Sequence, residues 1–365
     1  MSCLLTGGLL SAGCTQYKPF DSAGFLRGEF RKQVGPELAG RIEVPFQLDE
    51  QVRAAFKAGI RRAAPNEPEK VTQVLDYIFD RLHLEYAQFP TRSATAAFRE
   101  RKGNCLSFVN LFVGLAREEE GLNPFYVEVT DYQRWNHQKG LVISAGHIVA
   151  GMYLDGELKT YDFLPYRPKE YKQFHPIDDL GAVAHYYNNL GAEALISGDL
   201  AAARKLLTLA TEVAPRFDKG FNNLGVCLAR GGELDHALEI YRRGLEIDPG
   251  NLMILTNMAR AYQELGRVRE AAELLARIEG ANTTNPYFYV YQGEMALARG
   301  ETAKALDYMV RALRLDTETP EVHLGLVKVY LALGDREKAR HFLDRALKLN
   351  ATDKEALKYA RMLGK

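Results

Sequence analysis

Apolar residues recur at helical spacing in three segments of the first third of the chain. Residues 49–63 and 68–83 each place apolar side chains three or four positions apart. Gly103 interrupts the structure that precedes it, and residues 105–117 again follow a helical period. The pattern predicts two amphipathic helices and then a third, mostly buried helix whose first turn carries Cys105.

Two runs of strand character follow in residues 146–164. They flank Asp155-Gly156, which is a strong signal for a two-residue hairpin turn. With such a turn the numbers of paired residues sum to 311, and His147 and Asp162 lie diagonally on one face of the sheet. Their Cα atoms are then about 7 Å apart. The register therefore predicts an imidazole and a carboxylate within reach of each other.

The second half of the chain repeats itself every 34 residues without an insertion. Each unit has a glycine that can end one helix in a tight turn, and an alanine that lets the next helix pack closely on the first. These residues are Gly198, Gly232, Gly266, Gly300 and Gly334, and Ala203, Ala237, Ala271, Ala305 and Ala339. The period predicts five helical hairpins over residues 184–353, stacked as an all-α solenoid, and a capping helix over residues 354–365.

The composition excludes several classes of protein. Of the 365 residues, 47% are apolar and 26% are charged, as in an ordinary globular protein. Lys+Arg and Asp+Glu both total 47, so a net charge of zero gives no electrostatic footprint for nucleic acid. The cysteines are isolated and no histidine has a second ligand at helical spacing, so we expect no metal and no cofactor. No apolar run reaches the ~20 residues that a membrane helix needs.

Cys105 stands where a helix N-terminus presents unsatisfied backbone N–H groups and a partial positive charge. Both favour the thiolate over the thiol. The same N–H groups can stabilise the oxyanion that forms when a thiolate attacks an acyl group. Such a nucleophile needs a base, and the base needs an orienting group. His147 and Asp162 are the candidates for these two roles.

This arrangement resembles the transglutaminase-like domain, an α+β papain-like fold. The resemblance is carried by Gly103-Asn104-Cys105, by a first strand at residues 121–129, by Gly146-His147 and by Tyr161-Asp162. It implies that Cys105 is the nucleophile, His147 the base and Asp162 its orienter. The chain departs from the family pattern at Leu106, where an acidic residue is usual, and at Ile148, where an aromatic residue is common.

The 34-residue units are similar to tetratricopeptide repeats, which implies a scaffold that holds other polypeptides. The fold class is therefore an α+β transglutaminase-like domain followed by an all-α tetratricopeptide solenoid. We expect a lipoprotein signal over residues 1–14, an N-terminal extension over 15–48, the transglutaminase-like domain over 49–165, a proline-containing extended connector over 166–183, the repeats over 184–353 and the capping helix over 354–365.

Asparagine recurs at the sixth position of the first three repeats, as Asn189, Asn223 and Asn257. A carboxamide offers both a donor and an acceptor, so a row of them can pair with the backbone of an extended peptide without reading its side chains. The row predicts a peptide-binding concave face. The alternative is that these asparagines bond only to neighbouring turns of the protein itself.

The N-terminal stretch Leu10-Ser11-Ala12-Gly13-Cys14 resembles a bacterial lipobox, in which small residues precede the cysteine that is lipidated. Ser11 stands where leucine is usual, and no charged residue precedes the stretch. The resemblance implies lipidation at Cys14 and an anchored protein of the cell envelope that faces the periplasm. The alternative is a Gly-rich N-terminus of a cytoplasmic protein.

The function that these features predict is cysteine-dependent hydrolysis of an amide or peptide bond, or acyl transfer to an amine. The repeats would hold a protein substrate or a protein partner, and the membrane would be reached only through the lipid anchor. The alternative is a non-catalytic envelope scaffold that uses its repeats for protein–protein interaction, because a fold alone does not establish an activity.

Overall fold

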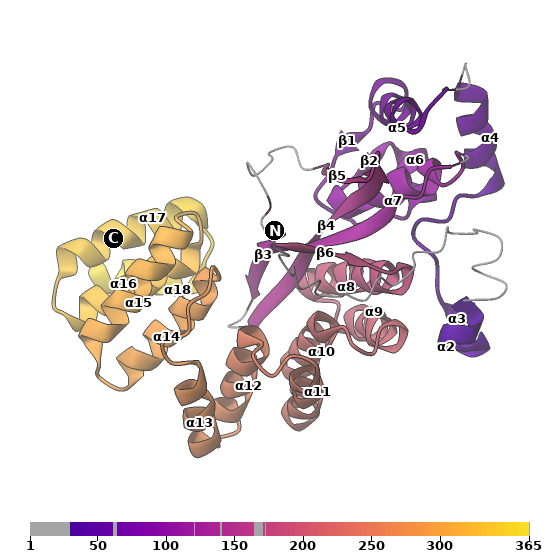
Figure 1. Ribbon diagram of the computed structural model, residues 1–365. Coiled ribbons are helices and arrows are strands. Elements are labelled where there is room, and N and C mark those ends of the chain that lie inside the picture. Colours follow the sequence, from indigo (N-terminus) through magenta and orange to yellow (C-terminus); the bar gives the residue numbers. More distant parts are fainter. Residues whose placement is uncertain are drawn as a thin grey trace, which may run out of the picture. The chain divides into compact units, whose positions relative to one another are not determined.

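The computed structural model describes residues 30–60, 64–119, 121–138, 141–163, 171 and 173–364, with only the backbone described for residues 30 and 131–146 (Figure 1). The candidate lipidation site, Cys14, lies outside the described residues. The described chain forms two compact units. The first reaches to Glu128 and also contains Ile148–Glu170 and Phe174–Asp179, and the second contains Val129–His147, Tyr171–Gln173 and the chain from Leu180 onward.

Short helices make up most of the first unit. Helix α4 begins after Asp49, whose side chain accepts a hydrogen bond from the Val52 N–H, and α5 begins after Asn66, which caps the Glu69 N–H in the same way. Both predicted amphipathic helices are therefore confirmed. The helices are α2 (Phe30–Val34), α3 (Pro36–Arg41), α4 (Glu50–Gly59), α5 (Glu67–Asp76) with its π-helical continuation Tyr77–Arg81, α6 (Ala94–Glu100) and α7 (Cys105–Ala116).

Helix α7 is the centre of the first unit. Every residue from Leu106 to Ala116 is buried, as the periodicity predicts. The segment 42–48, which the sequence assigns to an N-terminal extension, packs against this helix, and Phe46 is 1% exposed. A Cβ atom on Gly114 would lie 2.6 Å from the Phe46 carbonyl oxygen, so the helix and this segment approach each other at backbone distance. Residues 42–48 are thus part of the core.

A four-stranded sheet has the order β5-β4-β3-β6. Its strands are β3 (Phe125–Gln138), β4 (Leu141–Leu154), β5 (Glu157–Tyr161) and β6 (Phe174–Ile177), and a separate parallel pair joins β1 (Glu85–Tyr86) to β2 (Lys102–Gly103). The hairpin of β4 and β5 turns at Asp155-Gly156, both at positive φ. Leu154 faces Glu157 and Ala150 faces Tyr161, which confirms the predicted register.

Two segments differ from the sequence-based expectation. The sequence predicts a first strand at residues 121–129, but β3 continues to Gln138 and β4 begins at Leu141. The expected connector contains strand β6, and helix α8 begins at Asp179, before the first predicted repeat residue. The longer strands and strand β6 depend on pairing with residues distant in the sequence. Such pairing leaves no periodic pattern in the local sequence.

Five helical hairpins and a last helix make up the C-terminal half. The pairs are α8 (Asp179–Ser197) with α9 (Leu200–Val213), α10 (Asp218–Arg230) with α11 (Leu234–Ile247), α12 (Leu252–Glu264) with α13 (Val268–Ile278), α14 (Pro286–Ala298) with α15 (Thr302–Leu315), and α16 (Pro320–Ala332) with α17 (Arg336–Leu349), followed by α18 (Lys354–Leu363). The five period-34 glycines all have φ between 71° and 87° at the turn inside each pair, as predicted.

The close packing of the two helices in a pair is confirmed, because the five period-34 alanines are only 0–2% exposed. A Cβ on Gly225 in α10 would lie 2.3 Å from the ring of Tyr241 in α11, and one on Gly191 in α8 would lie 2.5 Å from Leu207 in α9. Cys227 is 3% exposed, and burial raises the pKa of its thiol. It is a small residue of the core between the helices. None of the described helices is long and apolar enough to span a bilayer.

Candidate functional site

Cys105 is the first residue of α7, and its side chain is partly exposed while the rest of the helix is buried. The residue before it, Asn104, caps the helix: its Oδ1 accepts hydrogen bonds from the Ser107 N–H at 3.0 Å and from the Ser107 hydroxyl at 2.8 Å. The Asn104 amide also donates to the Thr91 hydroxyl at 2.7 Å. The predicted position of Cys105 at a helix N-terminus is therefore confirmed.

Hydrogen bonds and close contacts also hold the backbone before Cys105 in place. Gly103 lies in β2, and its carbonyl accepts a hydrogen bond from the Ala87 N–H at 2.8 Å. A Cβ on Gly103 would lie 2.6 Å from the Cβ of Ser107, which is fully buried. The Ser107 hydroxyl in turn accepts a hydrogen bond from the Arg92 N–H at 2.8 Å. Only glycine fits between this strand and the first turn of α7.

Asp162 follows the last residue of β5 and is 8% exposed. Its two neighbours in the chain pack against α7. The ring centroids of Tyr161 and Phe112 are 5.1 Å apart, and those of Phe163 and Phe108 are 5.9 Å apart. Phe108 lies one helical turn after Cys105. These aromatic contacts fix the end of β5 on the helix that carries the candidate nucleophile.

His147 lies on β4 and is 1% exposed. A hydrogen bond of 2.9 Å joins its Nε2 atom to the hydroxyl of Tyr171, and the two ring centroids are 5.5 Å apart. Tyr171 lies in the expected connector, and no motif in the sequence marks it as a functional residue. The only signal in the sequence is the aromatic content of that stretch.

The candidate residues fall in both units. Cys105 and Asp162 belong to the first unit, and His147 is the last residue of the segment that belongs to the second. Regular pairing of the hairpin ends at Ala150 and Tyr161, one residue before Asp162 and three residues after His147. The assignment of the three residues as nucleophile, base and orienter stays a prediction. Among the described residues, no three His, Cys, Asp or Glu side chains form a group that could hold a metal ion.

The repeat asparagines bond to one another across successive helices. The Asn223 amide donates to Asn188 at 2.8 Å, the Asn257 amide donates to Asn222 at 2.9 Å, and the Asn222 amide donates to Asn223 at 3.0 Å. These four side chains are fully buried. Asn189, the first residue of the predicted row, is partly exposed and takes no part in the bonds described. The contacts fit the alternative interpretation, and peptide binding by Asn189, Asn223 and Asn257 stays a prediction.

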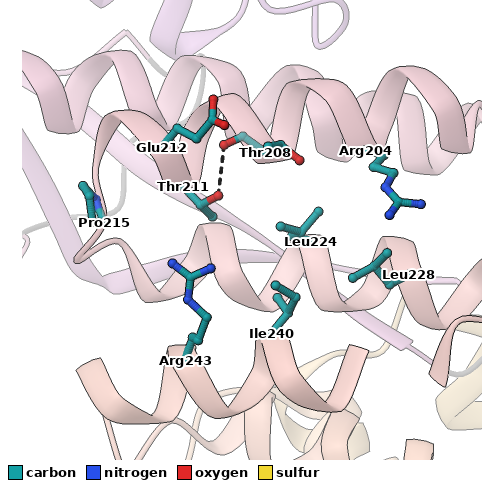
Figure 2. A pocket seen from close by; sticks show the side chains of 9 residues that line it. All are labelled: Arg204, Thr208, Thr211, Glu212, Pro215, Leu224, Leu228, Ile240 and Arg243. Atoms are coloured by element: carbon teal, nitrogen blue, oxygen red, sulfur yellow. Dashed lines mark hydrogen bonds between the residues drawn. The ribbon is translucent and has the colours of Figure 1, made fainter. Parts of the chain in front are cut away.

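A pocket of about 380 Å³ lies among α9, α10 and α11 (Figure 2). Its walls are apolar at Leu224, Leu228 and Ile240. Arg204 and Arg243 also line it; Arg204 pairs with Glu233 at 2.7 Å, and Arg243 lies 4.8 Å from the centre of the Phe221 ring. No cysteine or histidine lines this pocket, so it is separate from the candidate catalytic residues.

Family models match both halves of the chain. Residues 54–161 match the transglutaminase-like superfamily. Residues 188–251, 228–289 and 296–361 match tetratricopeptide repeats. The chain carries a transglutaminase-like domain followed by tetratricopeptide repeats. These matches confirm the resemblance to the transglutaminase-like domain and to tetratricopeptide repeats, and the repeats support protein–protein interaction.

Similar proteins match the repeat half. Small glutamine-rich tetratricopeptide repeat-containing protein 2 of Mycosarcoma maydis is 29% identical over 80 residues, which is 22% of this chain and 23% of that protein. The chain thus spans about a quarter of the length of this curated relative. A thermophilic TPR protein of Thermus thermophilus, TTC0263, is 23% identical with a TM-score of 0.43, covering 50% of this chain and 100% of that one. PilF of Pseudomonas aeruginosa is 23% identical with a TM-score of 0.42, covering 50% and 82%.

Proposed function

We propose that the protein is a cysteine-dependent hydrolase of amide or peptide bonds, with Cys105 as the nucleophile. The observation that carries the proposal is the place of Cys105, a partly exposed thiol at the first residue of a buried helix in a transglutaminase-like domain. In that first turn the Ser107 N–H is bonded to Asn104, and the backbone N–H groups of Cys105 and Leu106 are the ones proposed to face a developing negative charge. The repeats hold the polypeptide on which the thiol acts.

The proposed reaction has two steps. The Cys105 thiolate attacks the carbonyl carbon, and the tetrahedral oxyanion is stabilised by N–H groups of the first turn of α7. The C–N bond then breaks, and His147 gives its proton to the leaving amine, which leaves a thioester on Cys105. In the second step His147 takes a proton from water, the hydroxide attacks the thioester, and the carboxylic acid leaves as the thiolate is restored. If a lysine amine attacks in place of water, the same residues perform acyl transfer.

Alkylation with iodoacetamide tests the nucleophile. We expect Cys105 to react faster than free cysteine, because His147 is proposed to take the proton of its thiol. Cys227, which is buried, is an internal control that should stay unmodified in the folded protein. Mass spectrometry of the two peptides measures both rates, and His147→Ala should slow only the reaction at Cys105. If Cys105 reacts no faster than free cysteine, the chain is a binding scaffold and not an enzyme.

We also propose that the protein is lipid-anchored through Cys14 in the cell envelope, on the basis of the lipobox-like stretch. Mass spectrometry of the mature N-terminus tests this. An acylated Cys14 at the N-terminus would support the anchor, and a polypeptide that still begins at Met1 would exclude it. The substrate is best sought with the Cys105→Ala variant in cell-envelope extracts. This variant lacks the thiol, so it can bind a polypeptide substrate but cannot cleave it.

A further inference from the structure

Strands β3 and β4 are much longer than the strands on either side of them in the sheet. Each has 14 residues, whereas β5 has five and β6 has four (Figure 1). Strand β4 pairs with β5 only from Ala150 to Leu154, and β3 meets the chain before β6 at Thr130, whose N–H donates to the Gln173 carbonyl at 2.9 Å. Beyond these points residues 131–138 of β3 and 141–147 of β4 form a two-stranded ribbon.

Such a ribbon needs packing partners. A two-stranded hairpin is marginally stable by itself in water. Residues Val129–His147 are grouped with the repeats and not with the transglutaminase-like domain. Within that unit the other described residues are the helices with their turns and the short stretch Tyr171–Gln173. The helices are therefore the surface on which the ribbon can lie.

The burial of α10 shows that one of its faces is covered by something other than its partner helix. Lys219, Asn222, Val226 and Ala229 lie on one side of this helix, next to the side on which Gly225 meets Tyr241. Their exposed fractions are 8%, 0%, 0% and 9%. We call this side of the first helix in each repeat its inner face. Because Lys219 on this face is buried, another segment of the chain must lie over the face.

The same positions in the fifth repeat provide an internal comparison. In α16 they are Glu321, Leu324, Lys328 and Leu331, and all but Leu324 are partly exposed. In α8 they are His185, Asn188, Ala192 and Leu195, with exposed fractions of 0–5%. The inner face is thus buried (covered) in the first two repeats and partly exposed (open) in the last, although the helices have the same sequence period.

We propose that the ribbon Val129–His147 occupies the inner face of α8 and α10, as an intramolecular ligand of the repeats. An extended polypeptide that binds the repeats along this face must replace the ribbon. Because β4 continues without a break through His147, the exchange also changes how the candidate base is held. This coupling rests on the proposed function, whereas the occupancy of the inner face does not.

Hydrogen exchange in the full chain tests the occupancy. Ala229→Arg places a long cation on the covered face, and Leu331→Arg places it at the same helical position of the open face. We expect amides of residues 129–147 to exchange on the order of tenfold faster in Ala229→Arg and at the wild-type rate in Leu331→Arg. Unchanged exchange in Ala229→Arg, with α11 and α12 still protected, would overturn the proposal.

A second variant avoids any change to the helices. Residues 134–145 are replaced by an Asn-Gly turn, which closes a short hairpin. Lys219 should then be acetylated on the order of tenfold faster than in the wild type, because its cover is gone, while Lys328 should react as before. A Lys219 that stays protected would show that another segment covers the inner face and would overturn the proposal.

Alkylation of Cys105 in the same variants separates the two proposals. A changed rate in Ala229→Arg, with no change in Leu331→Arg, supports the coupling. Release of the ribbon without a change at Cys105 contradicts it. Absence of Cys105 reactivity already in the wild type contradicts the proposed function, and the exchange and acetylation results then still decide whether the ribbon occupies the repeats.

Discussion

An imidazole has two ring nitrogens, and the proposed reaction uses both of them. One exchanges a proton with Cys105 and the leaving amine, and the other is held by the orienting group. In this structure the Nε2 atom of His147 is bonded to the Tyr171 hydroxyl. Tyr171 is therefore a candidate positioning residue that shares the role predicted for Asp162.

Tyr171→Phe tests this role. Removing the hydroxyl leaves the aromatic packing in place and lets the imidazole turn, so we expect kcat to fall about tenfold and KM to stay constant, a loss of ~1.4 kcal/mol. Tyr153→Phe is a matched control, because Tyr153 lies on the same strand with 59% of its surface exposed. A higher kcat in Tyr171→Phe would show instead that the bond holds His147 away from Cys105.

Gly103→Ala tests the backbone before the nucleophile. The added Cβ cannot fit 2.6 Å from the Cβ of Ser107, so the first turn of α7 must shift. We expect a loss of about 1–3 kcal/mol in the free energy of unfolding, measured by urea denaturation, together with slower alkylation of Cys105. Gly40→Ala in α3 has nothing within 4 Å of the added atom and should leave both quantities unchanged. Equal behaviour of the two variants would contradict the assigned role of Gly103.

For single residues, the sequence predicts where a candidate residue lies on a helix or strand better than it predicts which other residue it contacts. The helical period places Cys105 at the start of α7, and the turn at Asp155-Gly156 sets the register of β4 and β5, because both follow from local geometry. Tyr171 could not be predicted. It lies 24 residues after His147, in the expected connector, where the sequence shows no helical or strand period.

The first helices of the repeats are the elements with the most polar interior. Asn188, Asn222, Asn223 and Asn257 form a buried hydrogen-bonded set that links three successive helices. Buried amides are stable only when they are bonded, so these side chains fix the spacing between repeats. Their recurrence is visible in the sequence, but whether they face a peptide or one another depends on what covers the inner face.

Tyr291 in α14 gives the repeats a defined response to alkaline pH. Burial raises its pKa to about 12, because the phenolate is poorly solvated there. Since the folded-state pKa lies above the unfolded one, Tyr291 contributes stability below pH 10, and this contribution is lost as pH rises toward 12. The gap from 10.0 to about 12 corresponds to ~3 kcal/mol.

The measurement is the difference in free energy of unfolding between the wild type and Tyr291→Phe, at pH values from 8 to 12. The wild type should lose stability relative to the variant across this range. Tyr287→Phe should show the same sign, because burial raises the pKa of Tyr287 to about 12 as well. A difference that stays constant with pH would contradict the assignment.

On the scale of the whole molecule, the chain does not run through its two units in series. Residues Val129–His147 and Tyr171–Gln173 are grouped with the helices of the C-terminal half, and the first unit resumes on either side of them. The sequence predicts two domains joined by a connector, because repeats and motifs reveal domains by their own periods. It cannot reveal that a strand pair of one domain folds with the helices of the other, since that association depends on contacts between distant residues.

The chain passes from the first unit to the second inside helix α8, and a buried ion pair holds this point. The Arg117 guanidinium donates to both carboxylate oxygens of Asp179, at 2.8 and 3.3 Å, and its side chain is 5% exposed. Asp179→Ala would leave the cation buried without its partner, so we expect a loss of about 3 kcal/mol in the free energy of unfolding.

The double variant Arg117→Met with Asp179→Ala serves as the control for this prediction. It removes the charge along with its partner, and it should recover a large part of the loss, because a well-packed apolar residue does not require desolvation of a charge. Urea denaturation of the single and double variants measures both effects. A double variant as unstable as Asp179→Ala would show that the effect arises from the helix terminus rather than from the buried cation.

The grouping of residues 129–147 with the helices has a consequence for how such a protein can arise and diverge. Joining the matched transglutaminase-like region, residues 54–161, to another partner by gene fusion would transfer the two long strands without the helices with which they fold. The strands would then present unpaired, poorly covered edges, which favour aggregation. We therefore expect the two halves to be inherited together, and substitutions on the inner face of α8 and α10 to be accompanied by substitutions in the strands.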